Sequence, residues 1–287
     1  MDDFHVLDDL LAIKYLRDMT DEELAAGIGV GRTTLMRWKS GEENISAKHA
    51  KDIYEFAFRC GIRLNRIKEQ LFREDHAGED SVVLFHGAKT QIYGELSLDY
   101  SAEDNDFGRG FYCGESLEQS AMFVAGYPES SLYICKFKVD NSLKCVRFNV
   151  DRDWMLAVAY YRKKLSGDAL PTIMRETIKR ASQADYFIAP IADNRMFVII
   201  DEFISGDITD VQCQHALSAT NLGKQYVFVS QRALERVEIL RHCYLTESEK
   251  RFYLESKQEE NRIGVDKVKA AKREYRGQGL YIDQLMK

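Results

Sequence analysis

The sequence has little proline, no closely spaced cysteine pair and no long hydrophobic segment. Only three prolines occur in 287 residues, so composition does not mark the linkers. The six cysteines form no Cys-x-x-Cys motif, which argues against a zinc site or a disulfide framework and favours reduced thiols. No run reaches the roughly 18 apolar residues that suggest a membrane span. The chain starts with Met1, Asp2 and Asp3, where a secretory signal would be basic. We therefore expect a cytoplasmic protein without a metal site or membrane contact.

Composition indicates a folded protein with a substantial core. Hydrophobic residues make up 45% of the chain and aromatic residues 11%, which excludes a disordered or low-complexity protein. The formal net charge is −6, from 40 Lys and Arg against 46 Asp and Glu, so the whole chain is no polycationic nucleic-acid coat. At roughly 100–200 residues per domain, the length favours about two domains.

Hydrophobic patterning divides the chain into three parts. Residues 1–75 have the spacing of several short amphipathic helices, and the polar stretch 74–80 follows as a candidate boundary. Residues 80–245 contain β-like runs at 82–85, 132–137 and 226–229, with helical candidates at 116–125, 152–165, 170–182 and 195–205. Residues 246–287 begin with a charged segment whose Glu and Lys pairs predict a solvated helical tail. The fold class predicted is α+β: a small all-α domain, then a β-sheet domain with flanking helices.

The first part contains a pattern typical of two helices joined by a tight turn. Thr20 precedes Glu23 by three residues, which is the spacing of a capping box. Gly29 would end that helix, and the next helix would bury Leu35 and Trp38. The segment 20–41 resembles the helix-turn-helix of phage-repressor-like proteins. The resemblance implies a DNA-facing surface made of Arg32, Thr33, Thr34, Arg37 and Lys39.

The charge of this part leaves a second interpretation open. Residues 1–72 hold 11 Lys and Arg against 13 Asp and Glu, a net charge of −2, whereas proteins that bind a DNA groove are usually basic. A small helical bundle that binds a protein partner is the alternative.

Three separated segments of the second part resemble a known enzyme superfamily when they are taken together. They are a strand that ends in His86-Gly87, the segment 106–112 followed by Ser120 and Phe123, and a late strand that starts near Gln225. Singly, each has a structural explanation as a turn, a tight loop or an edge strand. Their order and identities resemble the His–Tyr–Glu branch of the ADP-ribosyltransferases, which includes diphtheria toxin and the poly(ADP-ribose) polymerases. The segment 185–195 is also similar to an uncharacterised bacterial family of transferase-like domains, often encoded beside antitoxin-like partners.

The resemblance implies a split β-sheet and a role for each matching residue. NAD would be a consumed substrate. His86 would hydrogen-bond a ribose hydroxyl, and the backbone of Gly87 with the hydroxyl of Ser120 would hold the nicotinamide amide. Tyr112 and Phe123 would stack on the nicotinamide ring. Two further residues, Arg109 and Asp193, are candidates for contact with NAD.

Position 225 departs from the family pattern. Gln225 stands where the transferring enzymes carry a glutamate, so it keeps a hydrogen bond but loses the charge. Repeated chain elongation is therefore not expected, whereas single transfer or hydrolysis is. An alternative source of the missing carboxylate is Asp193. Asp106 and Glu235 are further alternatives with less support.

These observations predict a bacterial mono-ADP-ribosyltransferase with the catalytic residues His86, Tyr112 and Gln225. It would act as the toxin of a toxin–antitoxin or phage-defence system. Its expected partners are NAD, a protein or nucleic-acid acceptor, an antitoxin and operator DNA bound by the helix-turn-helix. Two alternatives stay open, an NAD glycohydrolase and a catalytically silent transcription regulator that senses NAD or ADP-ribose.

Overall fold

The structure is a computed structural model that describes residues 4–165, 172–220 and 222–286. Its helices are α1 (Val6–Leu16), α2 (Asp21–Ile28), α3 (Arg32–Ser40), α4 (Ala47–Arg59), α5 (Leu64–His76), α6 (Leu117–Val124), α7 (Arg152–Tyr161), α8 (Thr172–Ala181), α9 (Asn194–Ile204), α10 (Asp210–Ser218), α11 (Gln231–Leu234), α12 (Glu247–Glu274) and α13 (Ile282–Leu285). Its strands are β1 (Ser81–Ala88), β2 (Phe111–Gly114), β3 (Ser131–Lys138), β4 (Cys145–Arg147), β5 (Tyr186–Pro190), β6 (Lys224–Phe228) and β7 (Val237–Cys243). The chain therefore combines helices with one mixed sheet, consistent with the predicted α+β class.

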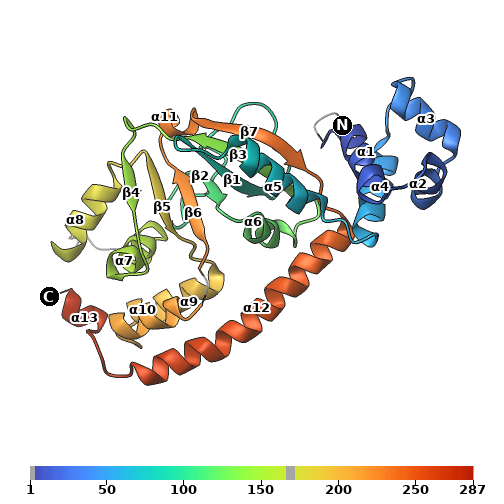
Figure 1. The fold of residues 1–287 in the computed structure, drawn as a ribbon. Helices are drawn as coiled ribbons and strands as arrows, with labels where there is room; N and C mark the ends of the chain where they lie inside the picture. Colours follow the sequence, from blue (N-terminus) through green and yellow to red (C-terminus); the bar gives the residue numbers. More distant parts are fainter. Residues whose placement is uncertain (1–3, 166–171, 221, 287) are drawn as a thin grey trace.

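Helices α1 to α4 form a small unit at the N-terminal end of the chain (Figure 1). The backbone N–H of Glu23 donates to the Thr20 hydroxyl, and the backbone N–H of Thr20 donates to the Glu23 carboxylate, so α2 begins with the predicted capping box. Gly29 ends α2 at a φ of 86°, a left-handed conformation that glycine adopts without strain. Leu35 and Trp38 on α3 are buried in the core of this unit, as predicted.

Helix α5 belongs to the first 75 residues but also packs on the sheet. It contacts β1, β3 and α6, and the Arg73 guanidinium donates to the carbonyl oxygen of Glu115 at 2.5 Å. At its other end, the Lys68 ammonium donates to Asp9 on α1 at 2.6 Å. Packing is therefore continuous across the polar stretch 74–80 that predicts a domain boundary.

The seven strands form one sheet in the order β4-β5-β6-β2-β1-β3-β7. Neighbouring strands are antiparallel except β4 and β5, which are parallel. Strand β1 pairs with β3 from Ser81 to Ala88, but its pairing with β2 is a single register pair, Phe85 with Gly114. The two halves of the sheet therefore meet at one point between β1 and β2.

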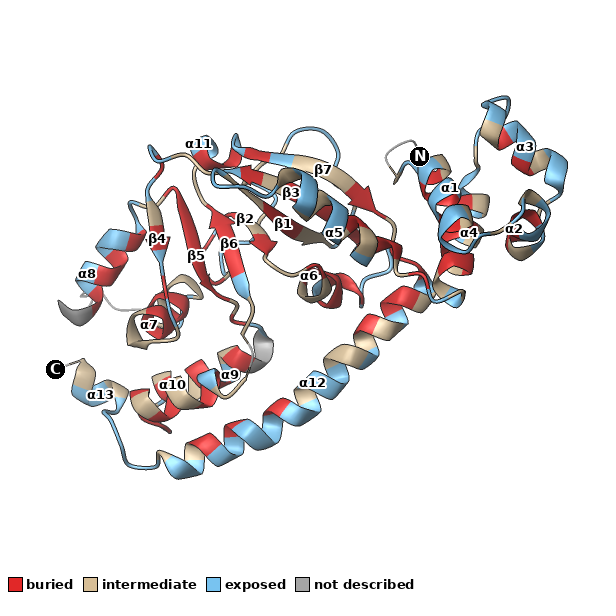
Figure 2. Ribbon diagram, in the orientation of Figure 1, coloured by how far each residue is buried: buried red, intermediate tan, exposed pale blue. Residues whose placement is uncertain are grey.

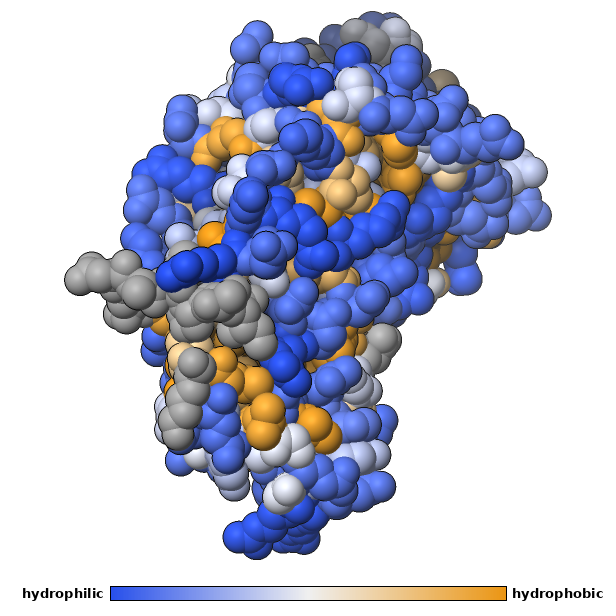
Figure 3. Space-filling view, turned by 90° about the vertical axis from the view of Figure 1, so that its left-hand side faces the viewer, coloured by the Kyte–Doolittle hydropathy of each residue, from blue (hydrophilic) through white to orange (hydrophobic). Residues whose placement is uncertain are grey.

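Alternate side chains build a core on each face of the sheet. Val83 and Phe85 pack with α6, whereas Leu84 between them packs on the opposite face with Phe137 and Phe228. Figure 2 shows buried residues concentrated on the central strands and exposed residues on the outer sides of the helices. The face shown in Figure 3 is mainly hydrophilic, with hydrophobic residues in small groups between hydrophilic ones. Among the described residues, none of the helices has both the length and the apolar character needed to cross a membrane.

Helix α12 connects the two ends of the molecule. It runs from the N-terminal helical unit, along the helices below the sheet, to α10 and α13 (Figure 1). Tyr253 is buried near its start, against the core around α6, and Val268 and Ala271 are buried near its end, against the core around α10. The predicted helix is present, but its two ends pack on the fold, and only the outward side matches a solvated tail.

Most elements predicted between residues 80 and 245 are present. The predicted strands correspond to β1, β3 and β6, and the predicted helices to α6, α7, α8 and α9. Helix α7 ends at Tyr161, earlier than predicted, and Lys163 just after it has a φ of 59°. Residues 170 and 171 of the fourth predicted segment lie outside the described part of the chain. The sequence reasoning missed β4, β5 and β7, and it placed residues 111 and 112 at the end of a glycine-rich segment, where the structure has the start of β2.

Candidate active site

The split between β1 and β2 brings the first two predicted catalytic residues together. The register of Phe85 with Gly114 would put Gly87 opposite Tyr112, but the strands are not paired there. The imidazole of His86 instead reaches across, and its Nδ1 lies 2.7 Å from the carbonyl oxygen of Tyr112. A side chain therefore replaces the backbone pairing at this point.

The environment of His86 defines its protonation state. A carbonyl oxygen only accepts, so Nδ1 carries the hydrogen that it donates to Tyr112. Burial lowers the pKa of His86 to about 4, although the hydrogen bond to Tyr112 opposes this shift. The ring is therefore neutral at pH 7, with Nε2 as a hydrogen-bond acceptor. Phe111 stacks on the imidazole with 4.1 Å between ring centroids, which fixes the ring plane.

Tyr112 closes the glycine-rich loop that precedes β2. Its hydroxyl donates to the carbonyl oxygen of Gly108 at 2.7 Å and accepts from the backbone N–H of Phe107 at 3.1 Å. Gly108 has a φ of 75°, so the loop turns where glycine is needed. Burial raises the pKa of the Tyr112 phenol, which stays neutral. The hydroxyl is engaged within the loop, and the ring face is what Tyr112 can offer to a ligand.

Helix α6 lies close against the split through two glycines and a serine. A Cβ on Gly87 would lie 2.6 Å from the carbonyl oxygen of Ser120, and one on Gly114 would lie 2.9 Å from the Ser120 hydroxyl. That hydroxyl is buried and donates to the carbonyl oxygen of Phe85 at 3.0 Å, so toward a ligand it can only accept. One turn later on α6, Phe123 is 59% exposed.

Gln225 is buried on the internal strand β6 and belongs to a polar cluster. Its Nε2 donates to Asp106 Oδ2 at 2.8 Å and to the carbonyl oxygen of Pro190 at 2.9 Å. Asp106 is itself buried and also accepts from the backbone N–H of Ala192 at 3.0 Å. Arg162 donates to Asp106 Oδ1 at 2.5 and 3.0 Å. The sequence reasoning named Asp106 only as a secondary alternative and missed Arg162, which has no motif around it.

The other candidates near the site have mainly structural contacts. Arg109 forms an exposed ion pair with Glu103 at 2.9 Å. The carboxylate of Asp193 accepts from the backbone N–H of Met196 at 2.9 Å and caps α9. Glu235 ends α11 and is exposed. Of the three alternative carboxylates, Asp106 is the one that contacts Gln225.

On α3, the predicted DNA-facing residues lie on the outer side of the helical unit. Arg32 and Thr33 are exposed and Thr34 is partly exposed. Each of the three cations lies near an acid of the same unit: Arg32 with Glu22 at 3.0 Å, Arg37 with Glu43 at 3.9 Å, and Lys39 with Asp21 at 3.0 Å. Any phosphate contact would therefore compete with an existing ion pair.

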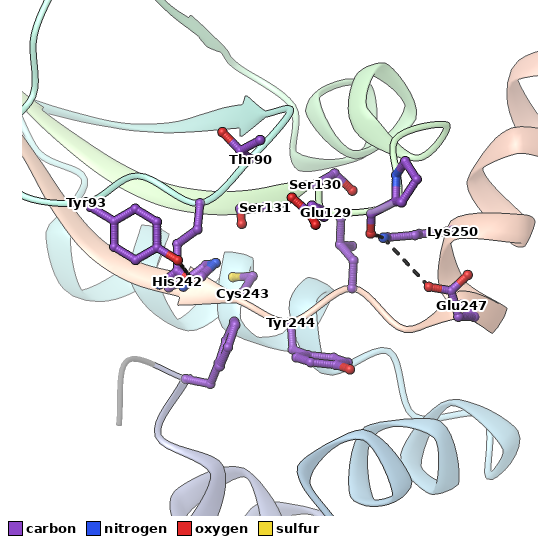
Figure 4. Close-up of a pocket in the computed structure, with 14 residues that line it drawn as sticks. Thr90, Tyr93, Glu129, Ser130, Ser131, His242, Cys243, Tyr244, Glu247 and Lys250 are labelled. Atoms are coloured by element: carbon purple, nitrogen blue, oxygen red, sulfur yellow. Dashed lines mark hydrogen bonds and ion pairs between the residues drawn. The ribbon is translucent and has the colours of Figure 1, made fainter. Parts of the chain in front are cut away.

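A separate pocket of about 430 Å³ lies where the helical unit meets the sheet (Figure 4). His242 and Tyr244 from β7 and the segment that follows it line one side, and Thr90 and Tyr93 from the loop after β1 line another. The Lys250 ammonium points to the carbonyl oxygen of Pro128 at 2.7 Å. The lining does not include His86, Tyr112 or Gln225, so this pocket is distinct from the split. No group of three or more potential metal ligands occurs among the described residues.

Comparison with known proteins gives a family without an assigned activity. A family model described as "Protein of unknown function (DUF3990)" matches residues 82–239, which is more than half of the chain. The matched part extends from β1 into β7 and includes the split, the Gln225 cluster and α6. A search of curated proteins finds no match.

Proposed function

The chain belongs to the family described as "Protein of unknown function (DUF3990)", and we propose that it is a mono-ADP-ribosyltransferase that consumes NAD. The observation that carries the proposal is the split between β1 and β2, where His86 bridges to Tyr112 on one face of the sheet and where α6 and β6 add Ser120 and Gln225 on the other face. These are the residues whose order in the sequence resembles the His–Tyr–Glu transferases.

Each group at the split has the hydrogen-bonding character that NAD binding needs. The Ser120 hydroxyl, as an acceptor, suits the NH₂ of the nicotinamide amide, and the unpaired strand edge at Gly87 suits both ends of that amide. His86 Nε2 accepts from a ribose hydroxyl. Tyr112 and Phe123 offer aromatic surface to the nicotinamide ring.

The chemistry is a substitution at the anomeric carbon of the nicotinamide ribose. The bond from C1′ to the pyridinium nitrogen breaks, and its electron pair leaves with neutral nicotinamide. A nucleophile on the acceptor forms the new bond to C1′ and loses its proton. The transition state has oxocarbenium character, so the protein acts by positioning and by stabilising charge. An uncharged Gln225 in place of glutamate costs about 1–3 kcal/mol of this stabilisation, which favours one transfer over chain elongation.

The test is incubation of the purified protein with adenylate-labelled NAD and a bacterial lysate. Protein, nucleic acid and small molecules are separated and counted. We expect label in one macromolecular fraction, and its loss in His86→Ala. His5→Asn is the matched control, because His5 lies outside the split in a left-handed conformation that asparagine tolerates. Label only in free ADP-ribose would instead identify a glycohydrolase. Absence of turnover together with NAD-dependent DNA binding would identify a sensor.

The N-terminal unit is proposed to bind a partner that controls the enzyme. A toxin's helix-turn-helix would bind operator DNA or an antitoxin through the exposed side of α3. The ion pairs of Arg32, Arg37 and Lys39 reduce the positive field that DNA would meet, which favours an antitoxin as the partner. The test of this contact is copurification with the product of the adjacent gene. The Arg37→Glu variant is compared with wild type.

A further inference from the structure

We infer that Asp106 is a positioning residue that turns the amide of Gln225 so that its oxygen faces the split. The inference rests on the proposed function for its consequence in catalysis, but the orientation follows from the contacts of Gln225. Asp106 is a buried carboxylate in the loop before β2, 119 residues before Gln225 in the chain.

The orientation of the amide follows from its partners. The Gln225 Nε2 group has two hydrogens, and two acceptors surround it, Asp106 Oδ2 at 2.8 Å and the carbonyl oxygen of Pro190 at 2.9 Å. Both acceptors lack a hydrogen to give, so the reversed amide would put oxygen against oxygen. The NH₂ end is thereby held on the side of β5, and Oε1 is left on the side of β2.

The neighbours of Gln225 on the β2 side are a glycine and a serine. Gln225 pairs across β2 and β6 with Gly114, which has no side chain, and the Ser120 hydroxyl lies next to the position that a Cβ would occupy. Oε1 therefore lies on the side of Gly114 and the Ser120 hydroxyl. It offers an acceptor to a ribose hydroxyl, which is the hydrogen bond that a glutamate would accept.

Arg162 and Ala192 hold the Asp106 carboxylate in place by donating to its two oxygens. The Arg162 guanidinium donates to Oδ1 and to the carbonyl oxygen of Ala192, while the Ala192 N–H donates to Oδ2. Together with the Gln225 amide, these donors give the Asp106 carboxylate four hydrogen bonds. The carboxylate accepts on both oxygens, whereas an amide at this position could not.

The experiment is a double-substitution cycle with Asp106→Asn and Gln225→Glu. In Asp106→Asn, the new NH₂ group faces either the Arg162 donors or the Gln225 NH₂ group. The Gln225 amide therefore rotates, and its Oε1 turns away from the split. We expect kcat for NAD cleavage to fall by about 10- to 100-fold with little change in KM. In Gln225→Glu, two carboxylates lie in contact, so the midpoint temperature of unfolding should fall relative to wild type as the pH rises above about 5.

The double variant should recover part of what each single variant loses. The amide introduced at position 106 can donate to the carboxylate introduced at position 225, which removes the contact between two carboxylates, whereas the carbonyl oxygen of Pro190 and the N–H of Ala192 stay without a partner. Both kcat and the pH profile of unfolding should therefore return toward those of wild type. Asp185→Asn is the matched control, since Asp185 is a buried carboxylate that accepts from the Lys144 N–H and the Ser230 hydroxyl at the other end of β5. It should lose stability without a change in kcat.

If the losses of the two single variants simply add in the double variant, both in kcat and in the midpoint temperature of unfolding, the inference is overturned. If wild type neither binds nor cleaves NAD while the unfolding cycle shows recovery, the proposed function fails and the positioning of Gln225 by Asp106 stands. If wild type cleaves NAD and Asp106→Asn cleaves it equally well, the proposed function stands and the inference fails.

Discussion

Gly87 shows how a single residue allows α6 to pack closely on β1. Beside it, β1 and α6 approach so closely that a methyl group would lie 2.6 Å from a backbone oxygen and 2.8 Å from Val124. Neither neighbour can move easily, because the oxygen is part of the backbone of α6 and Val124 is fully buried. Glycine is therefore required by the packing of α6, in addition to any contact with NAD.

We predict that Gly87→Ala lowers the free energy of unfolding by about 1–3 kcal/mol through overpacking. Urea unfolding measures this change. Gly126→Ala is the control just beyond α6, where the nearest atom to the new methyl group lies 3.9 Å away, an ordinary contact. Equal stability of the two variants would show that α6 shifts freely from β1.

At the scale of elements, the contact between α5 and α12 contains a buried acid. Both oxygens of Glu249 lie within 3.2 Å of the Asn65 side-chain nitrogen. Burial raises the pKa of Glu249 from 4.5 to about 7, although Asn65, the Thr246 N–H and the cations Lys68 and Arg63 oppose the shift. The folded state therefore holds a proton that the unfolded chain releases more readily.

This proton makes the stability of the contact depend on pH. The stabilisation is complete below about pH 4.5 and is lost as the pH rises through about 7. The free energy of unfolding of Glu249→Gln, relative to wild type, should therefore increase by about 1–3 kcal/mol between pH 5 and 8 and then level off. Thermal unfolding across this range tests it. The control Glu247→Gln changes an exposed side chain on the same helix, and a similar slope there would refute the assignment to Glu249.

At the scale of the whole molecule, a buried charge cluster holds the N-terminal unit on the sheet. Asp9 on α1 accepts from Lys68 on α5 at 2.6 Å, from Arg241 on β7 at 3.2 Å and from the Tyr54 hydroxyl at 2.7 Å. Aromatic contacts add to it, with Tyr54 stacked on Tyr244 at 4.7 Å between centroids. The N-terminal unit is therefore connected to the sheet through buried groups of four elements, α1, α4, α5 and β7.

Asp9→Asn should loosen this connection, because Lys68 and Arg241 would be left buried without an anion. Breaking a buried pair in this way costs about 3–5 kcal/mol. Limited proteolysis should then release the N-terminal unit before the sheet is cleaved, and the unfolding midpoint should fall. The control Asp8→Asn alters the neighbouring acid, whose side chain is 72% exposed. Cleavage of both variants at the same rate would contradict a role for the cluster.

The sequence alone determined the features that are local or strictly ordered along the chain. The capping box of Thr20 and Glu23, the end of α2 at Gly29 and the burial of Leu35 and Trp38 depend on neighbours within one or two turns, so they could be predicted. The positions of His86, Tyr112, Ser120 and Gln225 were found from their order, and their role as a catalytic site stays a prediction.

Only the tertiary structure decided which distant groups meet. Taken singly, Gln225 has an edge strand as its structural explanation, yet β6 lies between β5 and β2, and this buries the amide against Asp106, which is 119 residues away. Arg162 has no sequence signal, because a cation on a helix is usually solvated, and its role arises when α7 packs beside the loop before β2. Charge pairing and burial depend on contacts that chain folding creates, whereas caps and turns depend on residues that the chain already holds side by side.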